Sequence, residues 1–173
     1  MRVELLQIDI KSPVLRFTIR FVLFFLAAQA LVWVMNASEK MISVTLKLIT
    51  ITAGILYQLW DSHIWINGNM MLHPDNGRYL VIDQSCTGFQ MTATLVAGLA
   101  ASGCRKWTFY GLTILFIQVL NQIRIVHLFG LIHGDWTRFE FYHLGVWQGA
   151  NFILACLFFY FLLWYGGRHG SGS

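Results

Sequence analysis

Four stretches of this 173-residue chain are apolar enough to be candidates for crossing a lipid bilayer. They comprise residues 14–35, 86–103, 107–132 and 144–165. A helix needs about 20 apolar residues to cross the hydrocarbon core, where its backbone groups must bond to one another. The sequence therefore predicts an all-α polytopic membrane protein with four transmembrane helices, forming one membrane domain over residues 1–173. Residues 170–173, Gly-Ser-Gly-Ser, are typical of a cloning remnant and take no part in this prediction.

The charge content agrees with a membrane protein. Only 12% of the residues are charged, about half the share in soluble domains, and 57% are hydrophobic. The net charge of +4 would suit nucleic acid, but the basic residues stand beside apolar runs and form no tract. Membrane topology explains them better, because cytoplasmic loops are enriched in Lys and Arg. We expect the lipid bilayer, and no nucleic acid, as a partner.

Residues 38–59 are apolar but interrupted by charge. A spanning helix here would hold Lys47 near the bilayer centre, at a cost of about 2.5–3.5 kcal/mol. Polar residues recur at helical spacing along one stripe: Asn36, Lys40, Ser43, Lys47 and Thr50. The opposite face carries Ile42, Leu46, Ile49, Ile51 and Leu56. This pattern predicts an amphipathic helix lying in the membrane interface.

The segment 62–85 combines short apolar runs with strong turn signals. The runs cover residues 64–66, 70–72 and 79–82, and the turns are Asn67-Gly68 and Asp75-Asn76-Gly77. The pattern predicts a small β-meander. With four spans and a cytoplasmic amino terminus, basic residues split seven inside to four outside. Segments 61–85 and 133–143 are then extracytoplasmic.

Three chemically capable side chains are predicted to reach one membrane depth from three different helices. Cys86 opens the second span at its water-facing end, where a helix amino terminus would lower the thiol pKa. Arg124 lies 17 residues into the third span, about 25 Å, and normally needs a protein partner, although snorkelling to the outer headgroups is the alternative. His143 opens the fourth span. These residues would supply a nucleophile, a fixed positive charge and a base.

Further polar residues are candidates for supporting or substrate-binding roles. Asn121 and His127 share the helical face of Arg124 at three-residue spacing. Thr87 follows Cys86, and Gln148 lies alongside the face of His143. The remaining cysteines, 104 and 156, are interpreted as small buried hydrophobes, because cysteine in an apolar chain usually is one.

The order of these motifs resembles the exosortase/archaeosortase family. The matching residues are Ser85-Cys86-Thr87-Gly88, Asn121-Gln122-Ile123-Arg124-Ile125 and His143, within about residues 60–165. The run Phe-Tyr-His-Leu-Gly-Val-Trp-Gln at 141–148 looks most like the short exosortase H type. Thr87 stands where many members have Ser.

The resemblance implies a membrane cysteine transpeptidase or protease. Such an enzyme would cleave C-terminal sorting signals of exported proteins through a thioester on Cys86, with His143 transferring the proton and Arg124 stabilising the intermediate. Asn121 would position Arg124. The implied substrates are membrane-anchored proteins whose tail carries a short motif of the Ile-Pro-Thr-Leu type, a transmembrane helix and a basic end. The implied location is the cell membrane of a prokaryote, with the active site on the extracytoplasmic side and no cofactor.

Two other functions compete with this one. A metal site is conceivable from four side chains on the outer side: Cys86, His127, His133 and His143. The sequence lacks a His-Glu-x-x-His motif, and Arg124 would repel a cation, so we predict no metal. The second alternative is a non-enzymatic membrane subunit or chaperone in which Arg124 pairs with a partner's acidic group.

Overall fold

The computed structural model describes residues 12–75, 77–132 and 136–168, and these residues are mostly helical. The helices are α1 (Pro13–Ala37), α2 (Glu39–Tyr57), α3 (Phe89–Ala101), α4 (Trp107–Leu131), α5 (Trp136–Glu140) and α6 (Trp147–Arg168). A stretch of π-helix, η2 (Phe141–Val146), joins α5 to α6 without a break. The proposed cloning remnant at 170–173 lies outside the described residues.

Four helical segments of the described chain are long and apolar enough to cross a membrane: Pro13–Ala37, Glu39–Tyr57, Trp107–Leu131 and Thr137–Tyr165. The predicted number of four such helices is confirmed by length and composition. However, α2 is one of the four, and α3 is not. α3 has only 13 residues, about 20 Å, against a hydrocarbon core of about 30 Å. The helix predicted over 86–103 is shorter than expected, because it begins only after Gly88, whose φ is 71°.

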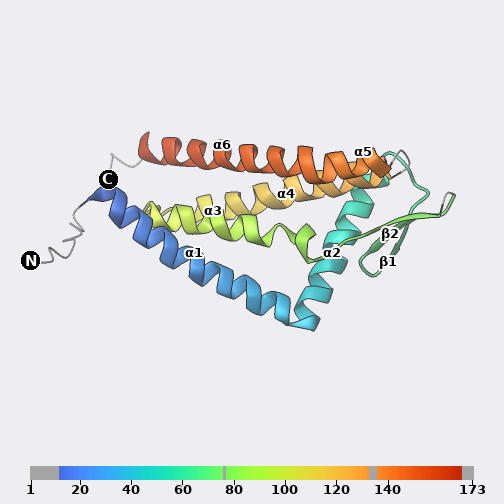
Figure 1. Ribbon diagram of the computed structural model, residues 1–173, viewed down its shortest axis with the longest axis horizontal. Coiled ribbons are helices and arrows are strands. Elements are labelled where there is room, and N and C mark those ends of the chain that lie inside the picture. The colour runs from blue at the N-terminus through green and yellow to red at the C-terminus, as the bar shows by residue number, and fades with distance from the viewer. Residues whose placement is uncertain (1–11, 76, 133–135, 169–173) are drawn as a thin grey trace, which may run out of the picture.

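α2 runs in a different direction from the other long helices. In Figure 1, α1, α3, α4 and α6 follow the long axis of the molecule, whereas α2 crosses it steeply beside the sheet. α3 contacts α1, α4 and α6, and α2 contacts α4 and the first strand. A helix that crosses a bundle in this way has the direction expected of an interfacial helix.

The faces of α2 agree only partly with the predicted stripes. Lys40, Ser43 and Lys47 are exposed, as predicted. Thr50 is fully buried instead, because its hydroxyl donates to the Leu46 carbonyl at 2.7 Å and so needs no water. Ile51, assigned to the buried face, is 44% exposed. The buried side of α2 holds Ile42, Leu46, Ile49, Thr50, Ala53 and Gly54.

The predicted β-meander is confirmed. Strands β1 (Trp65–Asn67), β2 (Met70–His73) and β3 (Arg78–Val81) form an antiparallel sheet in the order β1-β2-β3. Ile66 pairs with Met71, which in turn pairs with Leu80. Gly68 and Gly77 adopt φ values of 62° and 65°, the left-handed conformation that hairpin turns require.

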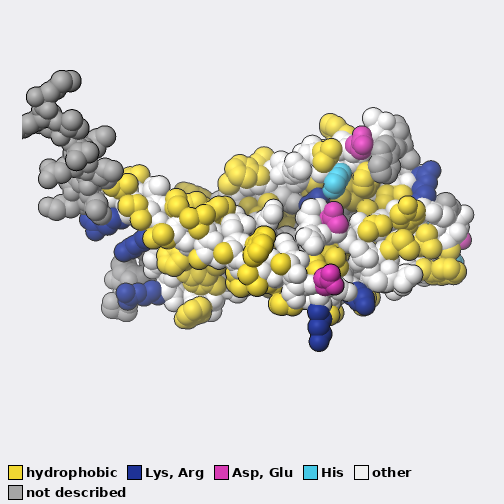
Figure 2. Space-filling model, turned by 60° about the horizontal axis from the view of Figure 1, so that its bottom comes forward, with side chains coloured by type: hydrophobic (Ala, Val, Ile, Leu, Met, Phe, Trp, Pro, Cys, Tyr) yellow, Lys and Arg dark blue, Asp and Glu magenta, His cyan; other side chains and the backbone are white. Residues whose placement is uncertain are grey.

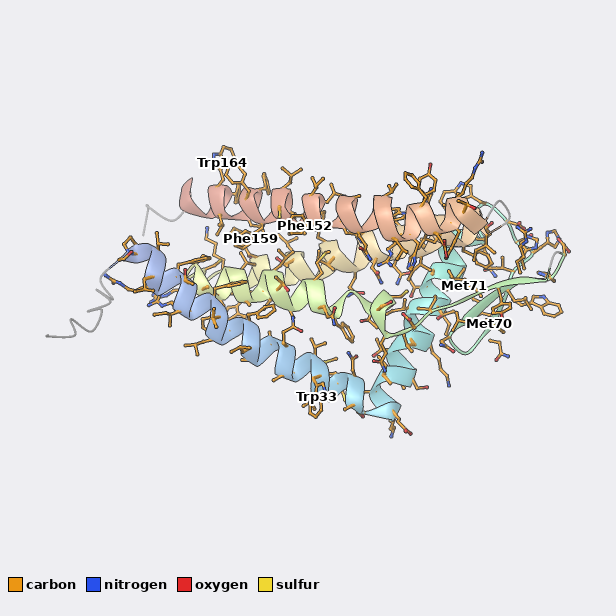
Figure 3. All side chains as sticks on the ribbon, viewed as in Figure 1. Trp33, Met70, Met71, Phe152, Phe159 and Trp164 are labelled. Atoms are coloured by element: carbon orange, nitrogen blue, oxygen red, sulfur yellow. The ribbon has the colours of Figure 1, made fainter. Side chains whose placement is uncertain are left out.

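An apolar core lies where α2, the sheet and α4 meet. Its buried members are Ile42, Leu46, Ile49, Ala53, Ile64, Met71, Ile82, Ile125 and Phe129. Met71 is fully buried, and Figure 3 shows where it leaves β2. Cys86, half-buried, packs against this core. The core thus fixes the segment between β3 and α3 that carries the candidate nucleophile.

Charged side chains are distributed unevenly over the surface. Figure 2 shows Lys and Arg side chains both at the end of the molecule where the chain begins and in the opposite half. The acidic side chains visible on that face lie in the half that carries α2 and the sheet.

A second, smaller core of Leu99, Phe109 and Leu162 packs α3, α4 and α6 together.

Candidate functional site

Cys86 lies in a tight turn between the sheet and α3. Residues Gln84–Thr87 form a 3₁₀ helix, η1, which is capped by Asp83. The Asp83 carboxylate accepts hydrogen bonds from the Ser85 backbone N–H at 2.9 Å and from the Ser85 hydroxyl at 2.6 Å. Short acidic side chains favour such turns because they satisfy backbone donors locally. Cys86 therefore does not stand at the amino terminus of a long helix, as the sequence analysis expected.

Two amides from α4 hold this turn by its backbone. The side chain of Asn121 donates to the carbonyl of Cys86, and Gln118 Nε2 donates to the carbonyl of Thr87 at 3.1 Å. Asn121 is only 4% exposed. A Cβ added at Gly88 would lie 3.7 Å from the Asn121 Cβ. The close approach of α4 thus fixes the position of the Cys86 main chain.

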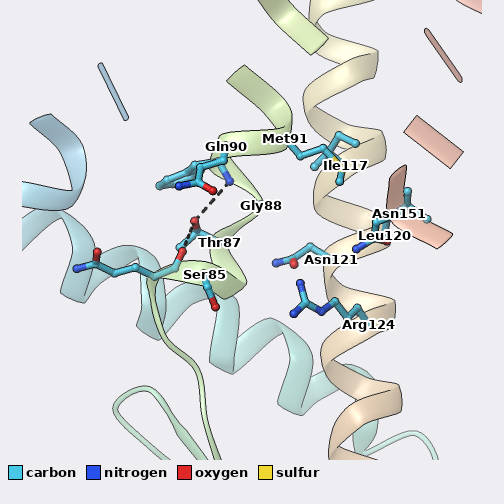
Figure 4. Close-up of a pocket in the computed structure, with 12 residues that line it drawn as sticks. Ser85, Thr87, Gly88, Gln90, Met91, Ile117, Leu120, Asn121, Arg124 and Asn151 are labelled. Atoms are coloured by element: carbon cyan, nitrogen blue, oxygen red, sulfur yellow. Dashed lines mark hydrogen bonds between the residues drawn. The ribbon is translucent and has the colours of Figure 1, made fainter. Parts of the chain in front are cut away.

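A cavity of about 160 Å³ with a mixed polar and apolar lining adjoins the turn (Figure 4). Its polar lining includes Ser85, Thr87, Gln90, Asn121, Arg124 and Asn151. In Figure 4, Asn121 and Arg124 project from α4 on the side of the turn that carries Ser85. Arg124 Nε and Asn151 Oδ1 are buried and have no hydrogen-bond partner among the described residues. Buried polar groups are usually satisfied, so this cavity has unmet donor and acceptor capacity that a ligand can use.

The thiol of Cys86 is harder to ionise than an exposed cysteine. Burial raises the pKa of Cys86, while the Asp83 backbone and the positive charge of Arg124 act in the opposite direction. The negative charge of Asp83 also raises this pKa. The lowered thiol pKa expected from a helix amino terminus is therefore wrong. Cys86 instead needs a base to become a thiolate near neutral pH.

Arg124 acts electrostatically on the two other residues that the sequence singled out, Cys86 and His143. The charge of Asp83 also acts on both. His143 does not open the last helical segment, as the sequence analysis expected, because that segment begins at Trp136. His143 lies in η2, half-buried, with its ring stacked on Phe139 at 5.5 Å between centroids. Arg124 on α4 thus lies within electrostatic range both of Cys86 in η1 and of His143 in η2. Cys86 and His143 do not themselves line the 160 Å³ cavity, which Arg124 does.

The four supporting candidates divide into two pairs. Asn121 and Thr87 line the cavity, and Thr87 is 2% exposed with its hydroxyl donating to the Gln84 carbonyl. His127 does not line the cavity. Its Nδ1 faces α6, where it accepts a hydrogen bond from Trp147 Nε1 at 3.0 Å. Gln148 is exposed and does not line the cavity.

Three polar residues near the site were not among the predicted site residues. Asp83 caps the turn, Gln118 binds the Thr87 carbonyl, and Asn151 lines the cavity from α6. A signal for two of them is present in the sequence. Gln118 precedes Asn121 by three residues on one helical face, and Asn151 follows His143 by eight, about two turns. The cap by Asp83 becomes evident only once the turn is known.

The metal alternative named Cys86, His127, His133 and His143 as ligands. Over residues 12–75, 77–132 and 136–168, no three His, Cys, Asp or Glu side chains are placed to hold a metal ion. His133, one of the four residues considered for such a site, lies outside these ranges.

The chain matches no protein-family model, no curated protein and no solved structure. The resemblance to exosortases therefore rests on the residues at 85–88, 121–125 and 141–148. Function has to be argued from those residues and from the geometry around them.

Proposed function

We propose that this chain is an exosortase-like membrane cysteine transpeptidase or protease, which cleaves C-terminal sorting tails of membrane-anchored proteins. One observation carries the proposal. Asn121 holds the backbone of Cys86, while Arg124, one turn further along α4, lines the adjoining cavity and acts electrostatically on both Cys86 and His143. A nucleophile, a base and a fixed positive charge are the groups that acyl transfer requires.

The proposed reaction assigns one step to each side chain. His143 removes the proton from Cys86 Sγ, and the thiolate attacks the carbonyl carbon of the scissile peptide bond. Arg124 stabilises the negative charge that develops on the carbonyl oxygen. The C–N bond then breaks, His143 protonates the leaving amine, and the acyl group remains on sulfur as a thioester. Water or an amine acceptor attacks this thioester and gives its proton to His143, which returns it to the departing thiolate.

The proposed membrane placement puts the site on the extracytoplasmic side of a prokaryotic cell membrane. α1, α4 and the segment Thr137–Tyr165 cross the bilayer, α2 lies in the outer interface, and the chain returns to the inner side through η1 and the short α3. Arg16 and Arg20 on α1 line the same cavity as Ser102, just beyond the end of α3, and Lys106 precedes α4. A basic end supports a cytoplasmic location by the positive-inside rule.

A second function is favoured by a single observation, the unsatisfied Nε of Arg124. In a non-enzymatic membrane subunit or chaperone, a partner's carboxylate would fill the cavity and pair with Arg124. The thiol would then be dispensable. The two functions therefore differ in what they require of Cys86.

A processing assay separates them. The chain is co-expressed with a membrane-anchored reporter whose tail carries a short recognition motif, a transmembrane helix and a basic end. Cys86→Ala should abolish cleavage, whereas Cys156→Ala should leave it intact. Cys156 is exposed on α6, so the expectation that it is buried is wrong. Unchanged cleavage by Cys86→Ala would refute the enzyme. Loss of assembly with Arg124→Gln, together with a functional Cys86→Ala, would establish the subunit.

A further inference from the structure

Asn151 is a buried residue of α6 with an unused hydrogen-bond acceptor. It is 8% exposed and lines the 160 Å³ cavity beside the turn that carries Cys86. Its Oδ1 is buried and receives no hydrogen bond from any residue in the ranges 12–75, 77–132 and 136–168. Burying an acceptor without a donor costs free energy, so such groups in native proteins usually have a partner outside the chain. An occupant of the cavity can supply the missing donor.

Contacts on both sides of Asn151 hold this face of α6 against α4. One turn before it, Trp147 Nε1 donates to His127 Nδ1 on α4 at 3.0 Å. Two turns after it, Phe158 stacks on Phe116 of α4 with 4.0 Å between the ring centroids. Positions four and seven residues apart share one face of a helix. Asn151 therefore lies on the face of α6 that packs against α4, and Figure 4 shows it reaching from α6 towards α4.

Several other polar groups of the cavity already bond within the turn. The hydroxyls of Ser85 and Thr87 donate to neighbouring residues of the turn, and the amide of Asn121 donates to the turn's backbone. Arg124 Nε, in contrast, is a buried donor without an acceptor among the described residues. Two buried groups that line the cavity are thus left over, the donor Arg124 Nε and the acceptor Asn151 Oδ1.

These two groups restrict what can occupy the cavity. An ionised carboxylate would satisfy Arg124, but it has no hydrogen to donate to Asn151 Oδ1 and would be repelled by this oxygen. A peptide main chain satisfies both groups, because each residue contributes a C=O acceptor and an N–H donor. The cavity of about 160 Å³ has about ten times the space that a single water molecule needs, so it can admit more than a water.

We propose that Asn151 binds the main chain of the sorting tail by accepting a hydrogen bond from a backbone N–H next to the scissile bond. Arg124 meanwhile holds the carbonyl oxygen of the scissile bond. The two side chains, from α6 and α4, fix the register of the peptide relative to Cys86, whatever side chains the peptide carries. This inference rests on the proposed function and adds a substrate-binding residue to it.

Ester substitutions in the substrate test this hydrogen bond without altering the protein. The purified native chain is given three synthetic tails: one with amide bonds only, and two in which an ester oxygen replaces the N–H of the amide directly before or directly after the scissile bond. One of the two esters should lower kcat/KM by about 5-fold to 150-fold, because Asn151 Oδ1 then has no donor. Cleavage of both esters at the rate of the amide tail would overturn the proposal.

Asn151→Leu removes the acceptor from the protein instead. It should lose as much kcat/KM with the amide tail as the sensitive ester loses with the native chain, and it should cleave these two tails equally. Its melting temperature should be no lower than that of the native chain, because an apolar group of similar size replaces an unsatisfied amide. Losses that multiply when ester and variant are combined, or a lowered melting temperature, would overturn the proposal and leave Asn151 a structural residue.

Asn36→Leu is the matched control variant. Asn36 Oδ1 is also buried without a hydrogen bond among the described residues, but Asn36 lies on α1 and does not line the cavity. This variant should cleave the amide tail like the native chain and remain sensitive to the same ester; loss of that sensitivity would overturn the proposal. If the native chain cleaves no tail at all, the proposed function fails and this inference with it. Cleavage that is insensitive to both esters refutes the role of Asn151 alone.

Discussion

The hydrogen bond between Asn121 and the Cys86 carbonyl permits a graded test of how the site is held. Asn121→Ala removes the donor and leaves a carbonyl without its partner in a half-buried turn. Leaving such an acceptor unsatisfied costs about 1–3 kcal/mol. If that cost falls on the conformation that positions the thiol, kcat/KM for reporter cleavage should decrease by about 5-fold to 150-fold.

Gln118→Ala is the matched control for this prediction. It removes the same kind of bond, made at 3.1 Å to the next carbonyl along the chain, that of Thr87. Both variants should lower the melting temperature by similar amounts, since each leaves one carbonyl unpaired. Only Asn121→Ala should reduce kcat/KM for cleavage by more than its lowered melting temperature can explain. Equal losses of cleavage in the two variants would refute a positioning role for Asn121 and leave it a structural residue.

Three further predictions concern the turn around the thiol. Gly88→Ala should lower the melting temperature by about 2–8 °C, because the φ of 71° costs a side-chain-bearing residue about 1–2 kcal/mol; no change would contradict the assigned conformation. The pKa of Cys86 can be measured from the rate of thiol alkylation against pH. Arg124→Gln should raise this pKa and Asp83→Asn should lower it, because the two native charges act on the thiol in opposite directions. Shifts in the same direction would contradict these two electrostatic effects. Burial raises the pKa of Asp83, but hydrogen bonds from Ser85 and Cys86 outweigh it and hold this pKa below 3.8. The Asp83 carboxylate should therefore stabilise the fold above about pH 4, and this stabilisation should be lost as the pH falls further. Asp83→Asn should lose less stability than the native chain over that range. Identical profiles of stability against pH for the two proteins would contradict the account.

The parts of the fold that depend on local signals were predictable from the sequence. The β-meander follows from Asn67-Gly68 and Gly77, because a left-handed turn between short apolar runs leaves few alternatives to a hairpin. The long apolar runs of α1 and α4 likewise predict their helices. The length of α3 was not predictable in this way, since Cys86 and Thr87 are small enough to suit the start of a membrane helix, while the backbone leaves the helical conformation at Gly88.

Tertiary contacts decide the features that the sequence analysis missed. Thr50 belongs to the polar stripe by type, yet it is buried because its hydroxyl bonds within α2. The raised pKa of Cys86 depends on its packing against the core between α2 and the sheet, which no spacing reveals. Asn121 and Arg124 could be selected as a motif on one helical face. The role of Asn151 in the cavity required the position of α6.

The covalent intermediate on Cys86 tests the proposed function most directly. The purified chain is mixed with the membrane-anchored reporter, quenched in acid and digested, and the peptide that contains Cys86 is weighed by mass spectrometry. The account predicts a hydroxylamine-sensitive adduct on this peptide, with the mass of the reporter's newly formed carboxyl-terminal fragment as an acyl group, and no adduct in Cys86→Ala. Reporter cleavage that proceeds without such an adduct, or that persists in Cys86→Ala, would contradict it.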